Sequence, residues 1–151
     1  MFPNGQAVQR RDIVGTNQAV SGFWRRVRQD YGTRQVIFEV KNYENMTVEE
    51  YRQVSGYLGK EYGSFGIILC RDKDTALRRG GDLESFREFY GKGQLIMKLP
   101  ASTLLSILSK LRSPERYDAG NAFLEKLLDT YIRMYASGQT EREKTSKKKK
   151  S

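Results

Sequence analysis

Residues 34–42 read RQVIFEVKN, an apolar and β-branched run that ends in charged and polar side chains. This composition favours a buried β-strand. Glu39 and Lys41 are two residues apart, so on a strand they share one face. One face can therefore be core while the other presents a carboxylate beside an ammonium, which is costly to bury unless the charges are matched. The apolar side chains of the core face are those of Val36, Phe38 and Val40.

The rest of the chain predicts strands alternating with helices around this stretch. A strand, a helix and a further strand form a right-handed crossover, so the strand over 66–70 should lie parallel to the one over 34–42. Apolar spacing and turn residues predict strands over residues 9–14, 34–42, 66–70 and 94–99, and helices over 21–31, 47–62, 83–90, 104–111 and 118–136.

Local sequence signals mark the N-terminal starts of two of these helices. Ser21 is a suitable N-cap, and Thr47 with Glu50 has the spacing of a capping box. Gly56 and Gly59 lie inside the second predicted helix, where each costs about 1 kcal/mol relative to alanine. We therefore expect this helix to approach the sheet closely at its glycines.

Helical spacing also predicts which helix side chains are core. We interpret Trp24 as a core residue rather than a base-stacking one, because it lies on the apolar stripe of its helix. Arg25, Arg26 and Arg28 can reach phosphates or form a solvated helix face. The stripe of the last helix contains Phe123, Leu127, Tyr131 and Met134.

Composition excludes several kinds of chemistry. The chain of 151 residues has no histidine, which excludes Ser–His and Cys–His nucleophiles and histidine-ligated metals. Cys70 is its single cysteine, which excludes an internal disulfide and a cysteine-based zinc site. A bound metal should therefore be a hard cation with oxygen ligands, and Mg²⁺ is the first candidate.

The charge predicts a polyanionic partner. The net charge is +9, of which residues 138–151 supply six basic and two acidic side chains. Excess positive charge on both parts of the chain is typical of nucleic-acid binding, although a solvated basic surface with a disordered tail explains charge alone equally well. Neither a membrane-spanning run nor a signal peptide is evident, so a cytoplasmic location is the default expectation.

A candidate metal site follows from three acidic and basic side chains. If the first two strands are neighbours, Asp12 and Glu39 can converge on one cation, and the Val40 carbonyl can add a ligand. Such a cation activates water for phosphodiester hydrolysis. Lys41 can orient or deprotonate that water, or balance charge on the phosphate. Taken alone, Asp12 is better explained by pairing with a neighbouring arginine, Arg10 or Arg11.

Three short segments carry a resemblance to a known family. They are RDIV at 11–14, FEVKN at 38–42 and QVSGYL at 53–58, the last on a predicted helix. Together they resemble the PD-(D/E)xK restriction-endonuclease-like superfamily, and the helical segment resembles the Gln-x-x-x-Tyr motif of its RecB-like branch. Arg11 stands where the family motif has proline.

The resemblance assigns roles to single residues. Asp12 matches the first aspartate of the motif, Glu39 its second acid and Lys41 its lysine. Gln53 and Tyr57 match the helical motif, which positions the site or the DNA in the family. The implied catalytic residues are Asp12, Glu39, Lys41, Gln53 and Tyr57, and the implied metal ligands are Asp12, Glu39 and Val40.

The resemblance also implies a fold and an activity. The fold is α/β and restriction-endonuclease-like, a mixed β-sheet flanked by helices, and the activity is Mg²⁺-dependent (or Mn²⁺-dependent) endonuclease hydrolysis of DNA. The family core opens with a helix that we expect this chain to lack. We expect a nuclease domain over 1–137, truncated at its N-terminus, and a disordered basic tail over 138–151. A homodimer, or an upstream domain of a larger DNA-processing or defence protein, is compatible with this.

Two other interpretations stay open. The chain can be a catalytically inactive nuclease-fold module that binds nucleic acid or regulates a larger protein. It can also be a structural α/β domain with a basic tail. Binding of DNA without cleavage would indicate the former, and loss of all DNA binding on removal of residues 138–151 the latter.

Overall fold

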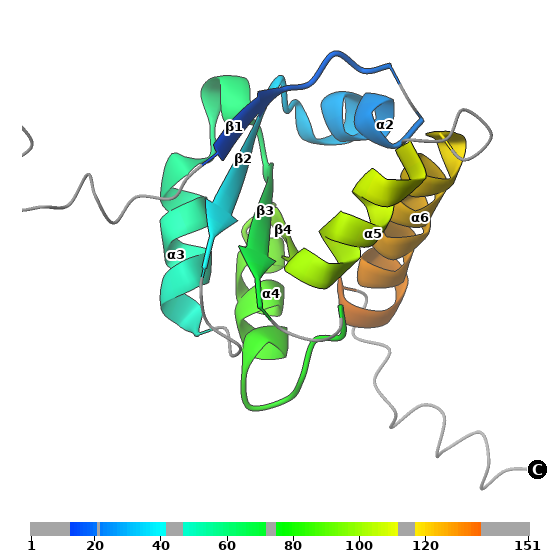
Figure 1. Ribbon diagram of the computed structural model, residues 1–151. Helices are drawn as coiled ribbons and strands as arrows, with labels where there is room; N and C mark the ends of the chain where they lie inside the picture. The colour runs from blue at the N-terminus through cyan, green and yellow to red at the C-terminus, as the bar shows by residue number, and fades with distance from the viewer. Residues whose placement is uncertain (1–12, 21, 42–46, 72–74, 112–116, 137–151) are drawn as a thin grey trace, which may run out of the picture.

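The computed structural model describes residues 13–20, 22–41, 47–71, 75–111 and 117–136, which form a mixed α/β fold (Figure 1). Asp12, Ser21 and residues 42–46 and 138–151, which carry several of the sequence predictions, lie outside these ranges. The elements are β1 (Ile13–Thr16), α2 (Gly22–Tyr31), β2 (Gln35–Val40), α3 (Val48–Tyr57), the 3₁₀ turn η2 (Lys60–Tyr62), β3 (Phe65–Cys70), α4 (Asp82–Gly91), β4 (Leu95–Pro100), α5 (Ala101–Leu111), α6 (Tyr117–Thr130) and the π-helical segment η4 (Tyr131–Ala136).

The four strands form one mixed sheet in the order β1-β2-β3-β4. β1 pairs antiparallel with β2, with Ile13 opposite Phe38. β2, β3 and β4 are parallel to one another, as the right-handed crossover predicts. β1 extends through Gly15 and Thr16, two residues beyond the predicted end of the strand over 9–14. In the described part of the chain no helix has the length and apolar character needed to cross a membrane.

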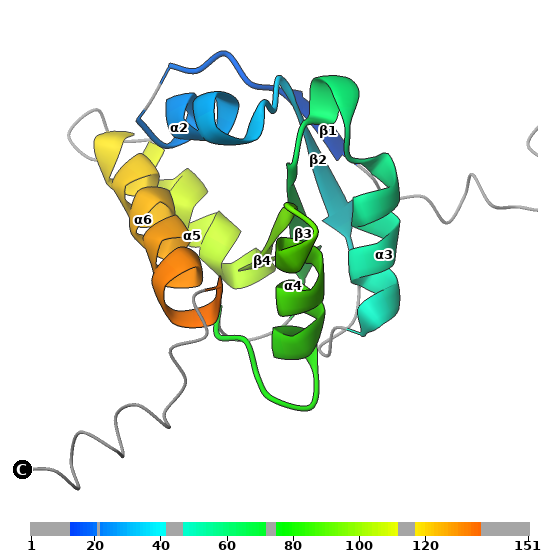
Figure 2. The ribbon, with the colours of Figure 1, turned by 180° about the vertical axis from the view of Figure 1, so that it is seen from behind.

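Helices cover both faces of the sheet. α3 and α4 pack on the face to which Gly66, Ile68 and Cys70 of β3 point, and α2 packs on the opposite face through a Phe23–Phe65 ring contact. Figures 1 and 2 show α3 and α4 on one side of the strands and α2 on the other, with α5 and α6 together next to β4.

The face that carries Glu39 is core as well, which corrects the prediction of one buried and one open face. Ile37 shares this face, is buried and lies near Gly66 under α3, and Glu39 itself is only 5% exposed. On the other face Val36 is buried, whereas Phe38 and Val40 are half-buried. The reason is that a strand between two others in a partly parallel sheet has helices on both faces.

Helix α3 confirms its predicted start and corrects its predicted end. The capping box is present: the Thr47 side chain caps the helix, and Glu50 returns to the Thr47 backbone. The helix ends at Tyr57 rather than near Tyr62, because Gly59 has a φ of +115°, which is outside the helical region.

The close approach of α3 to the sheet is made by a glycine of the strand, not of the helix. A side chain at Gly56 would meet nothing within 4 Å, so the expected contact of Gly56 with the sheet is wrong. A Cβ at Gly66 of β3 would lie 2.6 Å from Cγ1 of Val54. Gly66 therefore allows α3 to pack tightly over β2 and β3.

The last helical stripe is correct at its centre and wrong at its end. Leu127 and Tyr131 are buried and Phe123 is half-buried, but Met134 is 51% exposed. The chain is π-helical from Tyr131 onward, which widens the turn and changes the face on which later residues lie.

Candidate active site

Glu39 and Lys41 lie at the carboxyl end of β2, next to β3. Glu39 is opposite Ile68 in the parallel register, and the backbone N–H of Lys41 donates to the Leu69 carbonyl over 2.8 Å. The pairing thus extends one residue past the strand and fixes the backbone of Lys41. Carboxyl ends of parallel strands are the usual positions for ligand sites in open α/β sheets.

Lys41 joins the strand to helix α3. Its Nζ lies 3.0 Å from Oε1 of Glu39 and donates to Oε1 of Gln53 over 2.6 Å. The side chain of Glu39 is 7% exposed and that of Lys41 is 18% exposed. The carboxylate of Glu39 is therefore largely withdrawn from water, whereas part of the Lys41 side chain remains accessible to water.

The helical motif is brought to this pair by α3. Gln53 contacts Lys41 directly, so three of the residues assigned by the resemblance converge in space. Tyr57 follows one turn later as the last residue of α3 and is half-buried against the core. The capping box that starts α3 sets the helix in the position from which Gln53 reaches β2.

The metal ligands expected from the sequence are described only in part. Asp12 lies outside the described residues, and its chain neighbour Ile13 is opposite Phe38, one residue before Glu39. The N–H of Lys41 and the carbonyl of Val40 belong to one trans peptide group and point in opposite directions, so the Val40 carbonyl points away from β3 and toward the side of the sheet on which β1 lies. Across the described ranges there is no cluster of three acidic, cysteine or histidine side chains. The donors present there, a carboxylate and a carbonyl, are of the type that Mg²⁺ prefers.

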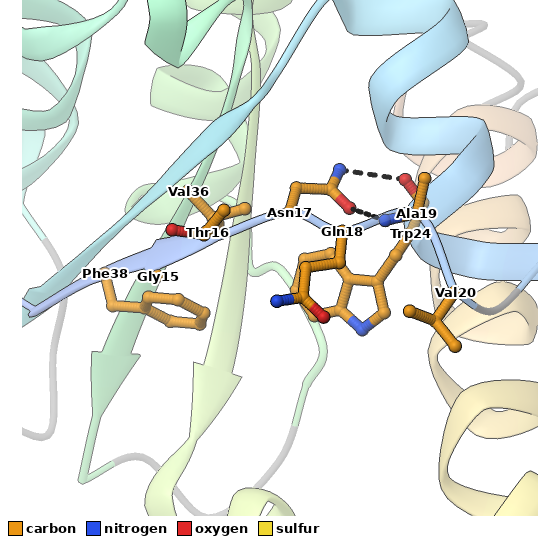
Figure 3. A pocket seen from close by; sticks show the side chains of 9 residues that line it. All are labelled: Gly15, Thr16, Asn17, Gln18, Ala19, Val20, Trp24, Val36 and Phe38. Carbon is orange, nitrogen blue, oxygen red and sulfur yellow. Dashed lines mark hydrogen bonds between the residues drawn. The ribbon is translucent and has the colours of Figure 1, made fainter.

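A cavity of about 240 Å³ lies on the opposite face of β2 from Glu39. It is lined by the end of β1, by residues 17–20, which follow β1, and by the side chains of Trp24, Val36 and Phe38 (Figure 3). Trp24 is half-buried at this cavity rather than fully within the core. None of the side chains that line the cavity is charged, so it is separate from the Glu39–Lys41 site in both position and chemistry.

A second acid–lysine pair was not predicted from the sequence. Lys98 of β4 is 0% exposed, and its Nζ lies 2.9 Å from Oδ2 of Asp82 at the start of α4. Lys98 is opposite Ile68, which is opposite Glu39, so the two pairs stand on the same row of the sheet. The available signal was a single lysine inside an otherwise apolar strand, which is rare without a partner.

Tyr131 completes the surroundings of this second pair. Its hydroxyl accepts from the backbone N–H of Lys98 and lies 3.2 Å from the carbonyl oxygens of both Lys98 and Thr75. Burial raises the pKa of Tyr131 well above its ordinary value, so the phenol stays protonated at neutral pH. The hydroxyl can therefore act as donor and acceptor at once.

Comparison with known proteins gives one informative match. The chain is 46% identical over 146 residues to the "Putative transposon gamma-delta 80.3 kDa protein" of Escherichia coli (strain K12). The match includes 96% of this chain and 21% of that protein, so the chain spans about one fifth of the relative's length. No family model and no solved structure matches the chain.

Proposed function

We propose that this chain is a Mg²⁺-dependent DNA endonuclease domain with a PD-(D/E)xK site. The observation that carries the proposal is the convergence on Lys41 of Glu39 from β2 and Gln53 from α3. Gln53 lies 12 residues after Lys41 and belongs to a different motif of the resemblance from Glu39 and Lys41. Their contact is what the motif pattern requires of a working site.

The arrangement of the strands supports the same proposal. An antiparallel strand followed by parallel strands, with α3 crossing between β2 and β3, is compatible with a restriction-endonuclease-like core. The pairing of Ile13 with Phe38 is compatible with a contribution of Asp12 near Glu39. The antiparallel β1–β2 pair is therefore the part of the sheet on which the proposed metal site depends.

Each residue has a distinct role in the proposed reaction. Asp12, Glu39 and the Val40 carbonyl would hold the cation, which supplies Lewis-acid stabilisation of charge on the phosphate. Lys41 would take a proton from the attacking water or donate a hydrogen bond to the phosphate oxygens. Gln53 would hold Lys41 in position through its 2.6 Å contact, and Tyr57 would position the site or the DNA.

Two observations favour DNA as the proposed substrate: the net positive charge of the chain and the name of the similar transposon protein. A net charge of +9 favours a polyanion. The relative is described by its name as a transposon protein, and a transposon is a DNA element. We extend that association to this chain as part of the proposal.

The test is cleavage of supercoiled and linear plasmid DNA in Mg²⁺, Mn²⁺ or EDTA. Cleavage should require the cation, and Asp12→Ala and Lys41→Ala should each lower its rate by roughly 10²–10⁴-fold. Asp118→Ala and Lys126→Ala, which remove exposed charges of the same kinds on α6, are the matched controls and should cleave normally.

Three results would overturn the proposal. Cleavage in EDTA would exclude the metal mechanism, and full activity in both site variants would exclude the assigned residues. Binding of DNA with no cleavage in any divalent cation would instead support an inactive nuclease-fold module.

A further inference from the structure

The loop before α4 is held in place by three buried side chains and by the half-buried Tyr135. Four hydrogen bonds fix its backbone between residues 75 and 78, and each partner comes from a different residue of β4, α4 or η4. They are Tyr131 Oη to the Thr75 carbonyl (3.2 Å), Lys98 Nζ to the Ala76 carbonyl (2.7 Å), the Leu77 N–H to Tyr135 Oη (3.3 Å) and the Arg78 N–H to Asp82 Oδ1 (2.6 Å).

The anchoring requires the burial of two charged side chains, which costs desolvation free energy. Lys98 and Asp82 are both buried, and removing two charges from water is expensive even when they pair. Hydrogen bonds to the loop backbone satisfy further donors and acceptors of the two side chains. The loop is therefore fixed to the sheet through the same network that makes the buried pair tolerable.

The anchored loop lies at the end of the sheet that carries the candidate active site. Lys98 shares a row of the sheet with Glu39, two strands or roughly 10 Å away. At the other end of the connection, Arg71 directly follows β3, whose Leu69 carbonyl binds the Lys41 N–H. Figure 1 shows the loop before α4 at the lower end of the sheet and α2 at the upper end.

The connection from β3 to α4 is positively charged. Residues 71–81 contain four basic side chains and the acids Asp72 and Asp74, of which residues 72–74 lie outside the described ranges. Asp82 is matched by Lys98, and Glu84 is bound by the N–H groups of Gly80 and Gly81. Arg71 and Arg79 are exposed, one at each end of the connection.

We propose that Arg71 and Arg79 bind the phosphate backbone of duplex DNA beside the Glu39–Lys41 site. The proposal rests on the proposed function, since it names a contact surface for the same substrate. Guanidinium groups suit phosphate oxygens because they donate two parallel hydrogen bonds. Arg79 directly follows the anchored backbone of residues 75–78, and Arg71 directly follows strand β3, so each arginine extends from an ordered segment, which lowers the ordering cost on binding.

The test compares two double variants that remove the same charge. Arg71→Ala/Arg79→Ala removes the proposed contacts, and Arg25→Ala/Arg28→Ala removes two exposed arginines of α2 at the opposite end of the sheet. Binding of a labelled DNA duplex is measured in EDTA by fluorescence anisotropy over a series of salt concentrations. Thermal melting monitors folding, which surface alanines should leave unchanged.

The loop double variant should bind roughly tenfold more weakly and lower the slope of log affinity against log salt by about 2. The α2 double variant should change both much less. Equal weakening in the two variants, or none in either, would overturn the inference. Plasmid cleavage distinguishes failure of this inference from failure of the proposed function. If the wild-type chain cuts DNA and the loop double variant binds DNA normally, only the proposed contact of Arg71 and Arg79 is refuted. If the loop double variant binds more weakly but the wild-type chain does not cut DNA, only the proposed nuclease activity is refuted.

Discussion

Two acid–lysine pairs lie on one row of the sheet, and they differ in how far the lysine is exposed to solvent. Glu39 and Lys41 are 3.0 Å apart with the lysine side chain 18% exposed, whereas Asp82 and Lys98 are 2.9 Å apart with the lysine 0% exposed. The ammonium of Lys41 can leave its partner and meet water or a ligand. The ammonium of Lys98 cannot, because it is enclosed by a carboxylate and a loop carbonyl. The same kind of pair thus has two roles: the Glu39–Lys41 pair can open to bind a ligand, and the Asp82–Lys98 pair holds the structure together.

The largest effect should follow removal of the buried acid's charge. Asp82→Asn leaves Lys98 charged and enclosed, so the free energy of unfolding should fall by about 3–5 kcal/mol. Urea unfolding followed by circular dichroism measures this. The double variant Asp82→Leu/Lys98→Met removes both charges and should recover most of the loss. A single variant as stable as the wild type would show that Lys98 reaches water after all.

A loss of stability of intermediate size is expected when the buried Tyr131 is replaced by phenylalanine, but not when the buried Tyr51 is. Tyr131→Phe breaks the hydrogen bonds to the backbone of Lys98 and should cost about 1–3 kcal/mol. Tyr51 is equally buried, but its hydroxyl makes no hydrogen bond with the residues that the structure describes. Tyr51→Phe should therefore be neutral or slightly stabilising. Thermal melts of both variants give the comparison, and equal losses would contradict the assigned network.

The smallest effect on stability should come from the Glu39–Lys41 pair, whose lysine side chain is 18% exposed. Glu39→Gln removes the same charge as Asp82→Asn, yet Lys41 can then turn to solvent, so unfolding should change by less than about 1 kcal/mol. Cleavage of DNA should nevertheless be lost if the proposed function is correct. Measured by the same urea titration, a loss as large as that of Asp82→Asn would remove the distinction between the two pairs.

The sequence allowed the first pair to be predicted and not the second, for a physical reason. The face shared by Glu39 and Lys41 follows from the two-residue period of a strand, and the start of α3 follows from the local capping box. Both signals lie within a few residues. Lys98 and Asp82 belong to separate elements, and their contact depends on how α4 packs against β4, which periodicity does not specify.

The remaining errors have similar origins. Met134 was wrongly predicted as core because the π-helical turn that starts at Tyr131 rotates all later residues to another face of the helix. No residue type in the sequence predicts such a turn. The exposed face expected for Glu39 proved to be covered because α3 approaches across Gly66, a contact between distant segments. The right-handed crossover was predictable since it is a rule of chain topology.

The hydroxyl of Tyr131 also has a consequence for how the molecule meets its neighbours. Among the residues that the structure describes, β4 is the last strand of the sheet, and its outer backbone groups at Lys98 are already bonded to that hydroxyl. A strand from another molecule cannot add there without displacing it, so this edge is protected against aggregation. At the other edge, β1 carries exposed Ile13 and Val14, and it is the side on which a further strand could extend the sheet.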